Sequence, residues 1–274
     1  MCPTVSAPRT LSSRSDDHRL ASQLAEEAGK LLVGLRRAAA AASRAGAQAR
    51  VSLGAEGDRQ ANRLILDRLA EARPGDAVLS EEAADTSARS GAARVWIVDP
   101  LDGTREFTEP ERTDWAVHVA LQADDRLVVG AVALPARGQV FATGAPLPPL
   151  GPVPAVPRMV VSRTRPPAVT EPIRRALGAA LVPMGSAGAK AMAVVRGDAD
   201  VYAHAGGQYE WDSAAPVAVA AAAGLWVSRL DGSPLVYNRP DPWLPDLLIC
   251  RPELVRAVLD AARTWVASED EVLG

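Results

Sequence analysis

The sequence predicts an α/β fold of two lobes, an α+β lobe followed by an α/β lobe. Two amphipathic helical patterns open the chain, and short β-branched runs spaced like an antiparallel meander follow them. A segment with six prolines, residues 144–157, then interrupts the pattern, and strands alternate with helices beyond it. With 274 residues, the chain is long enough to bury a sizeable core in two interlocked lobes.

Apolar spacing predicts the elements of each lobe. Apolar residues recur at helical intervals from Leu20 to Leu35, where residues 15–17 suit an N-cap, and again from about Asp58 to Ala72. The predicted strands of the first lobe are 78–79, 95–98, 115–121, 127–134 and 139–142. In the second lobe we expect strands at 159–162 and 246–250, and helices at 169–177, 191–195, 214–223 and beyond residue 253.

The proline-rich segment sets the predicted domain boundaries. We expect a flexible N-terminus at 1–15, an α+β lobe at 16–150 and an α/β lobe at 151–274.

Charge and composition exclude several classes of function. Thirty Lys and Arg stand against 33 Asp and Glu, a net charge of −3 with both signs scattered, so neither a nucleic-acid polymer nor a membrane is an expected partner. No apolar run approaches the roughly 18 residues of a membrane span, and residues 1–15 lack the apolar core of a signal peptide. Cys2 and Cys250 are far apart in the sequence and are not expected to form a disulfide framework, so we expect a cytoplasmic protein.

Two aspartates follow a predicted buried strand at a spacing of three. The run WIVDPLDGT at 96–104 presents Asp99 and Asp102, with the backbone carbonyl of Leu101 between them. Mg²⁺ accepts such a mixture of charged and neutral oxygens. Gly103-Thr104 is expected to open a helix, whose free N–H groups would favour a phosphate beside the metal. Taken alone, the pair also fits a plain turn with an N-cap.

Two further acidic positions extend this pattern. The string SEE at 80–82 ends another predicted strand, and Asp212 begins the predicted helix 214–223. Each has a simpler alternative, which is solvated loop charge for the first and helix capping for the second.

The strings at 80–82, 96–104 and 211–224, in this order, resemble the three metal-site motifs of the inositol monophosphatase superfamily. The resemblance extends to about Cys250. It implies a layered αβαβα sandwich, as in inositol monophosphatase and fructose-1,6-bisphosphatase, with most metal ligands in the first lobe and substrate specificity in the second. It also implies phosphomonoesterase activity with roughly two or three Mg²⁺ ions. The implied metal ligands are Glu81, Asp99, the Leu101 carbonyl, Asp102 and Asp212.

The same resemblance implies catalytic roles for Asp58, Thr104 and Glu81. In the family, a threonine after the Asp-Gly pair and an aspartate on the second helix orient the attacking water, and Thr104 matches the first of these. Before Asp58 this chain reads LGAEGD at 53–58, whereas relatives read something like S-P-V-T-x-A-D. Plain N-capping of the helix that it starts is therefore an alternative role for Asp58.

The second lobe carries the string GSAGAKAMAV at 185–194. We expect Ser186 to cap the following helix and Lys190 to lie in its first turn, where a cation suits a substrate with a second phosphate. A lysine that extends from a helix surface into solvent is the alternative. The string, together with Ser162-Arg163 and HAGGQYEWDSAAP at 204–216, resembles the actinobacterial CysQ branch of the superfamily. That branch implies hydrolysis of a small phosphorylated nucleotide, 3′-phosphoadenosine 5′-phosphate, and of its sulfated form, in sulfur metabolism and nucleotide recycling.

The implied substrate-binding residues are Asp102, Gly103, Thr104, Ser162, Arg163, Gly185, Ser186, Lys190 and Asp212. A metal site of this kind is shared by inositol monophosphatases and fructose-1,6-bisphosphatases, and a non-catalytic nucleotide sensor would keep the same fold. Inhibition by lithium and assembly as a homodimer are further implications of the resemblance. His204 and Tyr209 are candidates for the nucleotide pocket, and a structural role in its loop is the alternative for His204. His118 is expected to be a satisfied sheet residue.

Overall fold

The computed structural model describes residues 11–42, 47–85 and 87–273, with side chains for 15–42, 49–85 and 89–264. Residues 1–10, including Cys2, lie outside it, and helix α1 (Leu11–Ala41) already begins within the segment predicted as a flexible N-terminus. Ser15 therefore lies inside the helix, and its predicted N-cap role is wrong. The helix continues through this position because residues 11–15 contain neither glycine nor proline.

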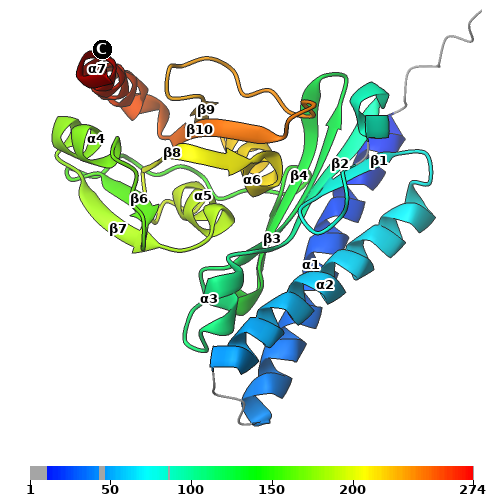
Figure 1. Cartoon of the computed structure of the whole chain (residues 1–274). Helices are drawn as coiled ribbons and strands as arrows, with labels where there is room; N and C mark the ends of the chain where they lie inside the picture. Colours follow the sequence, from blue (N-terminus) through cyan, green and yellow to red (C-terminus); the bar gives the residue numbers. More distant parts are fainter. Residues whose placement is uncertain (1–10, 43–46, 86, 274) are drawn as a thin grey trace, which may run out of the picture.

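Five layers of helices and sheets alternate through the molecule (Figure 1). From one outer layer to the other, the helices are α1 and α2 (Ala47–Ala72), then α5 (Ala187–Val195) and α6 (Glu210–Ala222) between the sheets, then α4 (Thr170–Leu177) and α7 (Val255–Leu273). Three apolar cores fill the spaces between the layers. The αβαβα sandwich that the resemblance implies is thereby confirmed.

The first sheet has the order β1-β2-β3-β4-β5. Its strands are β1 (Ala77–Ser80), β2 (Arg94–Asp102), β3 (Ala116–Ala123), β4 (Arg126–Leu134) and β5 (Gln139–Ala142). β1 and β2 run parallel, and the remaining neighbours are antiparallel, as the predicted meander requires. α1 and α2 cover one face of this sheet and α6 packs on the other.

The second sheet has the order β7-β6-β8-β10-β9, with β7, β6 and β8 parallel and the last two strands antiparallel. Its strands are β6 (Arg158–Ser162), β7 (Ala180–Met184), β8 (Val201–Tyr209), β9 (Trp226–Ser228) and β10 (Trp243–Cys250). Residues 144–157 contain neither helix nor strand and connect the two sheets, as predicted. Within the described part of the chain, no helix is long and apolar enough to cross a membrane.

Helix α2 begins at Ala47, well before the predicted start near Asp58. Gly54 and Gly57 lie in this first part of the helix, and both let α2 approach its neighbours closely. A Cβ atom at Gly54 would lie 2.8 Å from Thr104 Cγ2, and one at Gly57 would lie 3.0 Å from Phe107 Cε1. Tertiary packing thus outweighs the low helix propensity of glycine. Asp58 lies inside α2 as a result, and the alternative role as its N-cap is wrong.

Short helices complete the fold. They are η1 (Ser87–Gly91), α3 (Thr104–Thr108), η2 (Pro135–Arg137) and η3 (Pro252–Leu254).

Candidate active site

The parallel pairing of β1 and β2 brings two acidic strings together. Ser80 pairs with Val98, and the backbone N–H of Glu81 donates to the Val98 carbonyl at 3.3 Å. Glu81 therefore follows β1 at the level where Asp99 follows Val98. Two strings that are 18 residues apart in the sequence thus meet at one edge.

A bulge in β2 turns both of its aspartates toward one site. The register against β3 shifts between Asp99 and Asp102, and the N–H of Leu101 donates to Asp99 Oδ1 at 3.0 Å. Bulges of this kind re-aim side chains. One carboxylate oxygen each of Asp99, Asp102 and Asp212 lie within 4.8 Å of one another. We call these three residues the carboxylate triad.

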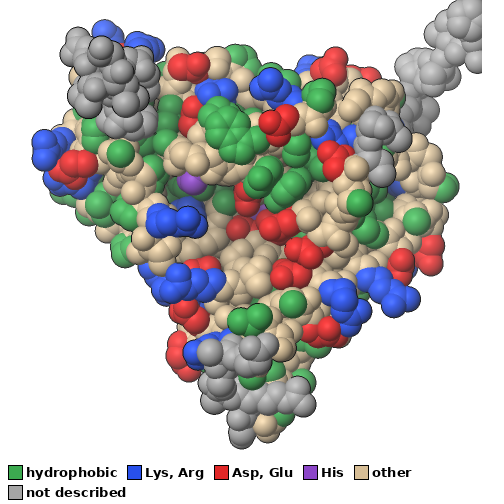
Figure 2. Space-filling view, viewed as in Figure 1, with side chains coloured by type: hydrophobic (Ala, Val, Ile, Leu, Met, Phe, Trp, Pro, Cys, Tyr) green, Lys and Arg blue, Asp and Glu red, His purple; other side chains and the backbone are tan. Residues whose placement is uncertain are grey.

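Asp212 reaches the triad from the first turn of α6. Its Oδ2 accepts a 2.6 Å hydrogen bond from the backbone N–H of Tyr209, so the predicted capping interaction is present and the same side chain also joins the triad. Glu81 is exposed at the edge of the triad. In Figure 2, acidic side chains gather around a hollow near the centre of the face shown.

Asp99, Asp212 and Glu81 have raised pKa values, and the cause and the size of the shift differ from one residue to the next. Burial, reinforced by the charges of Asp102 and Glu81, raises the pKa of Asp99 well above its usual range. Burial and the charge of Asp102 raise the pKa of Asp212 to about 6. Partial removal from water, with the charges of Asp212 and Asp102, raises the pKa of Glu81 to about 7. Crowded carboxylate oxygens of this kind are the donors that hard divalent cations bind, so the residues present fit a metal site.

Asp102 stays ionised because His118 and the start of α5 lie around it. Ser186 Oγ donates a short hydrogen bond to its Oδ2, and the N–H of Gly188 donates to the same oxygen at 2.6 Å. Burial alone would raise the pKa of Asp102. The charge of His118, the hydrogen bond from Ser186 and the charge of Lys190 outweigh burial and hold this pKa at about 2.

His118 is a site residue that the sequence did not reveal. It is fully buried in β3, opposite Asp99, with Nδ1 3.1 Å from the Trp211 carbonyl and Nε2 3.2 Å from Asp102 Oδ2. The expectation of a satisfied sheet residue is confirmed for its place in β3 and its contact with the Trp211 carbonyl, but the ring also contacts Asp102 of the site, which was not expected. The sequence does show a polar residue, His118, within an alternating apolar strand. Its contact with Asp102 follows only from the register between β2 and β3, which the sequence does not give.

Asp58 and Thr104 meet beside the triad. Thr104 Oγ1 lies 3.3 Å from Asp58 Oδ1 and 3.2 Å from the Leu101 carbonyl, so one hydroxyl proton has two acceptors. Burial and the charge of Glu82 raise the pKa of Asp58 to about 7, against the hydrogen bond from Thr104. The pairing that the resemblance implies is thus present in spite of the divergent residues before Asp58.

Lys190 lies beneath the loop that begins α5. Ser186 caps this helix as predicted, since its Oγ accepts from the N–H of Ala189 at 3.0 Å. Lys190 is buried, and its Nζ donates to the carbonyls of Gly185 at 3.0 Å and Ser186 at 2.7 Å, 5.3 Å from the centre of the Tyr202 ring. The alternative of a lysine extended into solvent is therefore wrong.

Two further groups near this loop carry charge. Asp114, which sequence reasoning missed, accepts from the N–H of Gly185 at 2.6 Å. Arg163 donates to Glu106 Oε1 at 2.6 Å and to Glu109 Oε1 at 3.2 Å. Ser162 Oγ accepts from a backbone N–H in its own loop. Contact of Ser162 and Arg163 with a substrate stays a prediction.

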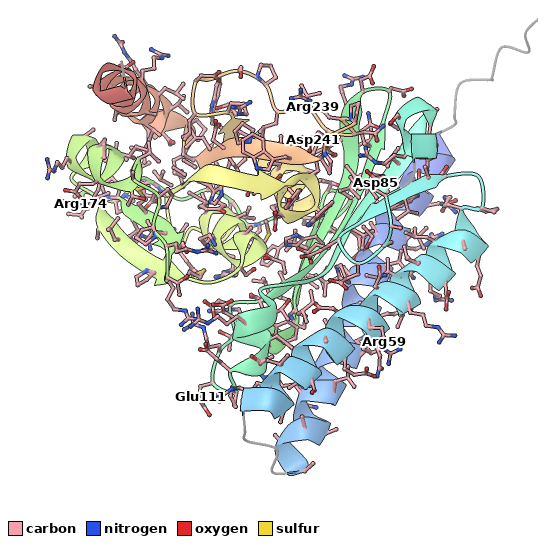
Figure 3. All side chains as sticks on the ribbon, in the orientation of Figure 1. Arg59, Asp85, Glu111, Arg174, Arg239 and Asp241 are labelled. Carbon is pink, nitrogen blue, oxygen red and sulfur yellow. The ribbon has the colours of Figure 1, made fainter. Side chains whose placement is uncertain are left out.

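A buried arginine, also missed, joins the lobes above the site. Arg89 donates to the carbonyls of Arg239 at 2.8 Å and Pro240 at 3.1 Å, and it pairs with Asp85. Glu210 accepts from the N–H of Arg239 at 2.8 Å. Figure 3 shows Asp85, Arg239 and Asp241 at this junction. The loop before β10 is thereby fixed to both lobes.

Comparison with known proteins places the chain among phosphatases. It is 54% identical over 251 residues to the 3′-phosphoadenosine 5′-phosphate phosphatase of Mycobacterium bovis, which covers 87% of this chain and 91% of the relative. The phosphatase of the same name from Mycobacterium leprae is 51% identical over 262 residues, covering 90% of this chain and 93% of the relative.

A solved structure and a family model agree with these relatives. The crystal structure of CysQ from Bacteroides thetaiotaomicron, described as a bacterial member of the inositol monophosphatase family, superposes with a TM-score of 0.72 at 25% identity, covering 86% of this chain and 97% of that one. The model of the inositol monophosphatase family matches residues 15–257. This match and the conserved layout of the fold confirm the predicted resemblance: the chain belongs to the inositol monophosphatase family.

Proposed function

We propose that this protein is a Mg²⁺-dependent phosphomonoesterase that removes the 3′-phosphate of 3′-phosphoadenosine 5′-phosphate and of its sulfated form. The observation that carries the phosphatase assignment is the Asp58–Thr104 pair, 3.3 Å between Oδ1 and Oγ1, beside the carboxylate triad. The choice of nucleotide is supported by the relatives at 51% and 54% identity that bear this name. It fits a role in sulfur metabolism and nucleotide recycling in the cytoplasm.

The metal site is built from hard oxygen donors. Glu81, the triad and the Leu101 carbonyl would hold roughly two or three ions. When bound, Mg²⁺ neutralises phosphoryl oxygens, lowers the pKa of water and stabilises the leaving alkoxide. The carboxylates compensate the charge of closely spaced cations, which explains why so many acidic side chains converge here.

The chain's own residues prepare the attacking water. When the Thr104 hydroxyl donates to Asp58, its oxygen lone pairs are free to accept a hydrogen from water, which fixes the direction of that water. Asp58, with a pKa of about 7, is suited to accept a proton near neutral pH. The start of α5 has a positioning role, since the N–H groups of Gly188 and Ala189 donate to Asp102 and Ser186 and hold Asp102 in place.

Rival functions predict different kinetics. We would measure Mg²⁺-dependent phosphate release from 3′-phosphoadenosine 5′-phosphate, inositol 1-phosphate and fructose 1,6-bisphosphate and compare kcat/KM. A clear nucleotide preference supports the proposal. A flat profile or a preference for inositol phosphate would overturn the specificity and leave the phosphatase assignment intact.

One variant distinguishes an active enzyme from a nucleotide sensor that does not catalyse the reaction. Asp102→Ala removes a triad carboxylate, so the enzyme should lose phosphate release almost entirely. Equal release from both proteins would contradict catalysis at this site. We further propose inhibition by lithium and assembly as a homodimer, which a lithium titration of activity and a sedimentation measurement would test.

A further inference from the structure

Aromatic side chains lie at the rim of the candidate site in a chain that has few of them. The sequence contains only six Trp, three Tyr and two Phe. Among the described side chains, the exposed aromatic residues include Tyr209 at 46% and Trp243 at 45%. Tyr and Trp are enriched at binding interfaces, where the apolar body of the ring is covered and the polar end stays in water.

Tyr209 is directly joined to the carboxylate triad. Its N–H donates to Asp212 Oδ2 at 2.6 Å, and its ring stacks on Trp211 with 4.8 Å between centroids and 12° between planes. Trp211 is half-buried and packs against the core between the sheets. One face of the Tyr209 ring therefore packs on Trp211, and the ring retains exposed surface beside the metal site.

Trp243 lies on the same face of the second sheet. It is paired with Tyr209 across β10 and β8, and paired residues project to the same side. A Cβ atom at Gly207 would lie 2.5 Å from Trp243 Nε1, so the indole covers β8 where only glycine leaves room. Gly207 also has a φ of +91°, which disfavours other residues.

The segment before Trp243 is held in place from both lobes. The N–H of Trp243 donates to Asp241 Oδ1 at 3.0 Å, and Arg89 and Glu210 fix the backbone at Arg239. An aromatic ring on a fixed backbone loses little conformational freedom when a ligand stacks on it. Hydrophobic side chains adjoin the acidic ones on the face shown in Figure 2.

We propose that Tyr209 and Trp243 form a stacking platform for the base of a nucleoside 3′,5′-bisphosphate whose 3′-phosphate lies at the triad. The inference rests on the proposed function and names the part of the site that selects nucleotides. Aromatic stacking uses the face of a base and does not read its edge. The platform therefore favours nucleotides over sugar phosphates and tolerates a guanine in place of adenine.

The test compares a substrate that has a base with one that lacks it. Tyr209→Leu and Trp243→Leu should each lower the ratio of kcat/KM for 3′-phosphoadenosine 5′-phosphate to that for inositol 1-phosphate, by roughly 5- to 150-fold. The loss should appear in KM for the nucleotide. Tyr209→Phe keeps the ring and should keep the ratio. Trp226→Leu, which removes a 40% exposed Trp from the edge strand β9, is the matched control.

Other outcomes separate the platform from the proposed function. If wild-type protein prefers the nucleotide and both Leu variants keep the ratio, the platform is overturned and the function stands. If wild-type protein shows no preference, the function is overturned, and calorimetric binding of 3′-phosphoadenosine 5′-phosphate in EDTA tests the platform alone. Weaker binding by both Leu variants would then support it, and unchanged binding would refute it. A change from dimer to monomer in the Trp243→Leu variant would instead identify an interface between copies.

Discussion

His118 and Asp102 connect the first sheet to α5 and α6, the two helices between the sheets. His118 Nε2 lies 3.2 Å from Asp102 Oδ2, and its Nδ1 lies 3.1 Å from the Trp211 carbonyl in α6. A carbonyl can only accept, so Nδ1 carries a hydrogen. Burial lowers the pKa of His118, but the charge of Asp102 and the contact with the Trp211 carbonyl outweigh burial and leave this pKa above its ordinary value. The imidazole thus holds Asp102 and α6 in a fixed relation.

The first prediction concerns the space that His118 occupies. A Cβ atom at Gly188 would lie 2.0 Å from His118 Nε2, so Gly188→Ala should destabilise the protein by about 1–3 kcal/mol through overpacking. His118→Ala should also destabilise it by about 1–3 kcal/mol, because Asp102 and the Trp211 carbonyl each lose a partner. Urea unfolding of both single variants measures these costs.

The double variant decides whether the two costs share one cause. Once His118 is shortened to Ala, the methyl added at position 188 no longer meets the imidazole, and its remaining close neighbour is the Ala116 Cβ at 3.0 Å. The second substitution should therefore cost clearly less than it does alone. Two costs that simply add would show that the imidazole and Gly188 do not compete for the same space.

The second prediction concerns the water-orienting hydroxyl. Thr104→Ala removes the donor to Asp58 and should lower kcat by about 100- to 10,000-fold with a smaller effect on KM. Thr104→Ser keeps the hydroxyl and should retain most activity. Steady-state kinetics with 3′-phosphoadenosine 5′-phosphate measure both variants. Equal losses of kcat in the Ser and Ala variants would show that the Thr104 hydroxyl takes no part in the reaction.

The third prediction uses the close packing of α2 on Thr104. A Cβ atom at Gly54 would lie 2.8 Å from Thr104 Cγ2, so Gly54→Ala should displace Thr104 and lower kcat. Thr104→Ser removes that methyl group. The double variant should therefore be more active than Gly54→Ala alone, and a less active double variant would contradict this account.

Local patterns in the sequence predict much of this fold. Short β-branched runs bounded by turn residues marked all five strands of the first sheet, and the Gly103-Thr104 turn marked the start of α3. The acidic residues at 81, 99, 102 and 212 stood out because each follows an apolar run or opens a helix. Features set by neighbours in sequence are the ones that such reasoning recovers.

Tertiary contacts account for what the sequence did not predict. The early start of α2 depends on Thr104 and Phe107, which make glycine favourable inside this helix. His118 becomes a site residue only through the register of β3 on β2. Arg89 joins residues about 150 positions away, and no local pattern encodes such a contact.

The fourth prediction concerns the role of Lys190. Its ammonium holds the carbonyls of Gly185 and Ser186, and Ser186 in turn donates to Asp102. Lys190→Met should therefore lower kcat/KM for 3′-phosphoadenosine 5′-phosphate and for inositol 1-phosphate by similar factors, since the loop serves both. A loss confined to the nucleotide would show direct contact between Lys190 and a second phosphate.

The fifth prediction links pH, metal and stability. An acid whose pKa is raised by folding binds more protons in the folded state, so the free energy of unfolding falls as pH rises between the unfolded and folded pKa values. For Asp212, with a folded pKa of about 6 against an ordinary 3.8, the loss amounts to about 3 kcal/mol between about pH 4 and 6. Urea unfolding in EDTA should show this decline, and Asp212→Asn should reduce it. Mg²⁺ must displace the protons, so it should stabilise the protein more at pH 8 than at pH 5. Equal stabilisation at both values would mean that Mg²⁺ binds away from these carboxylates.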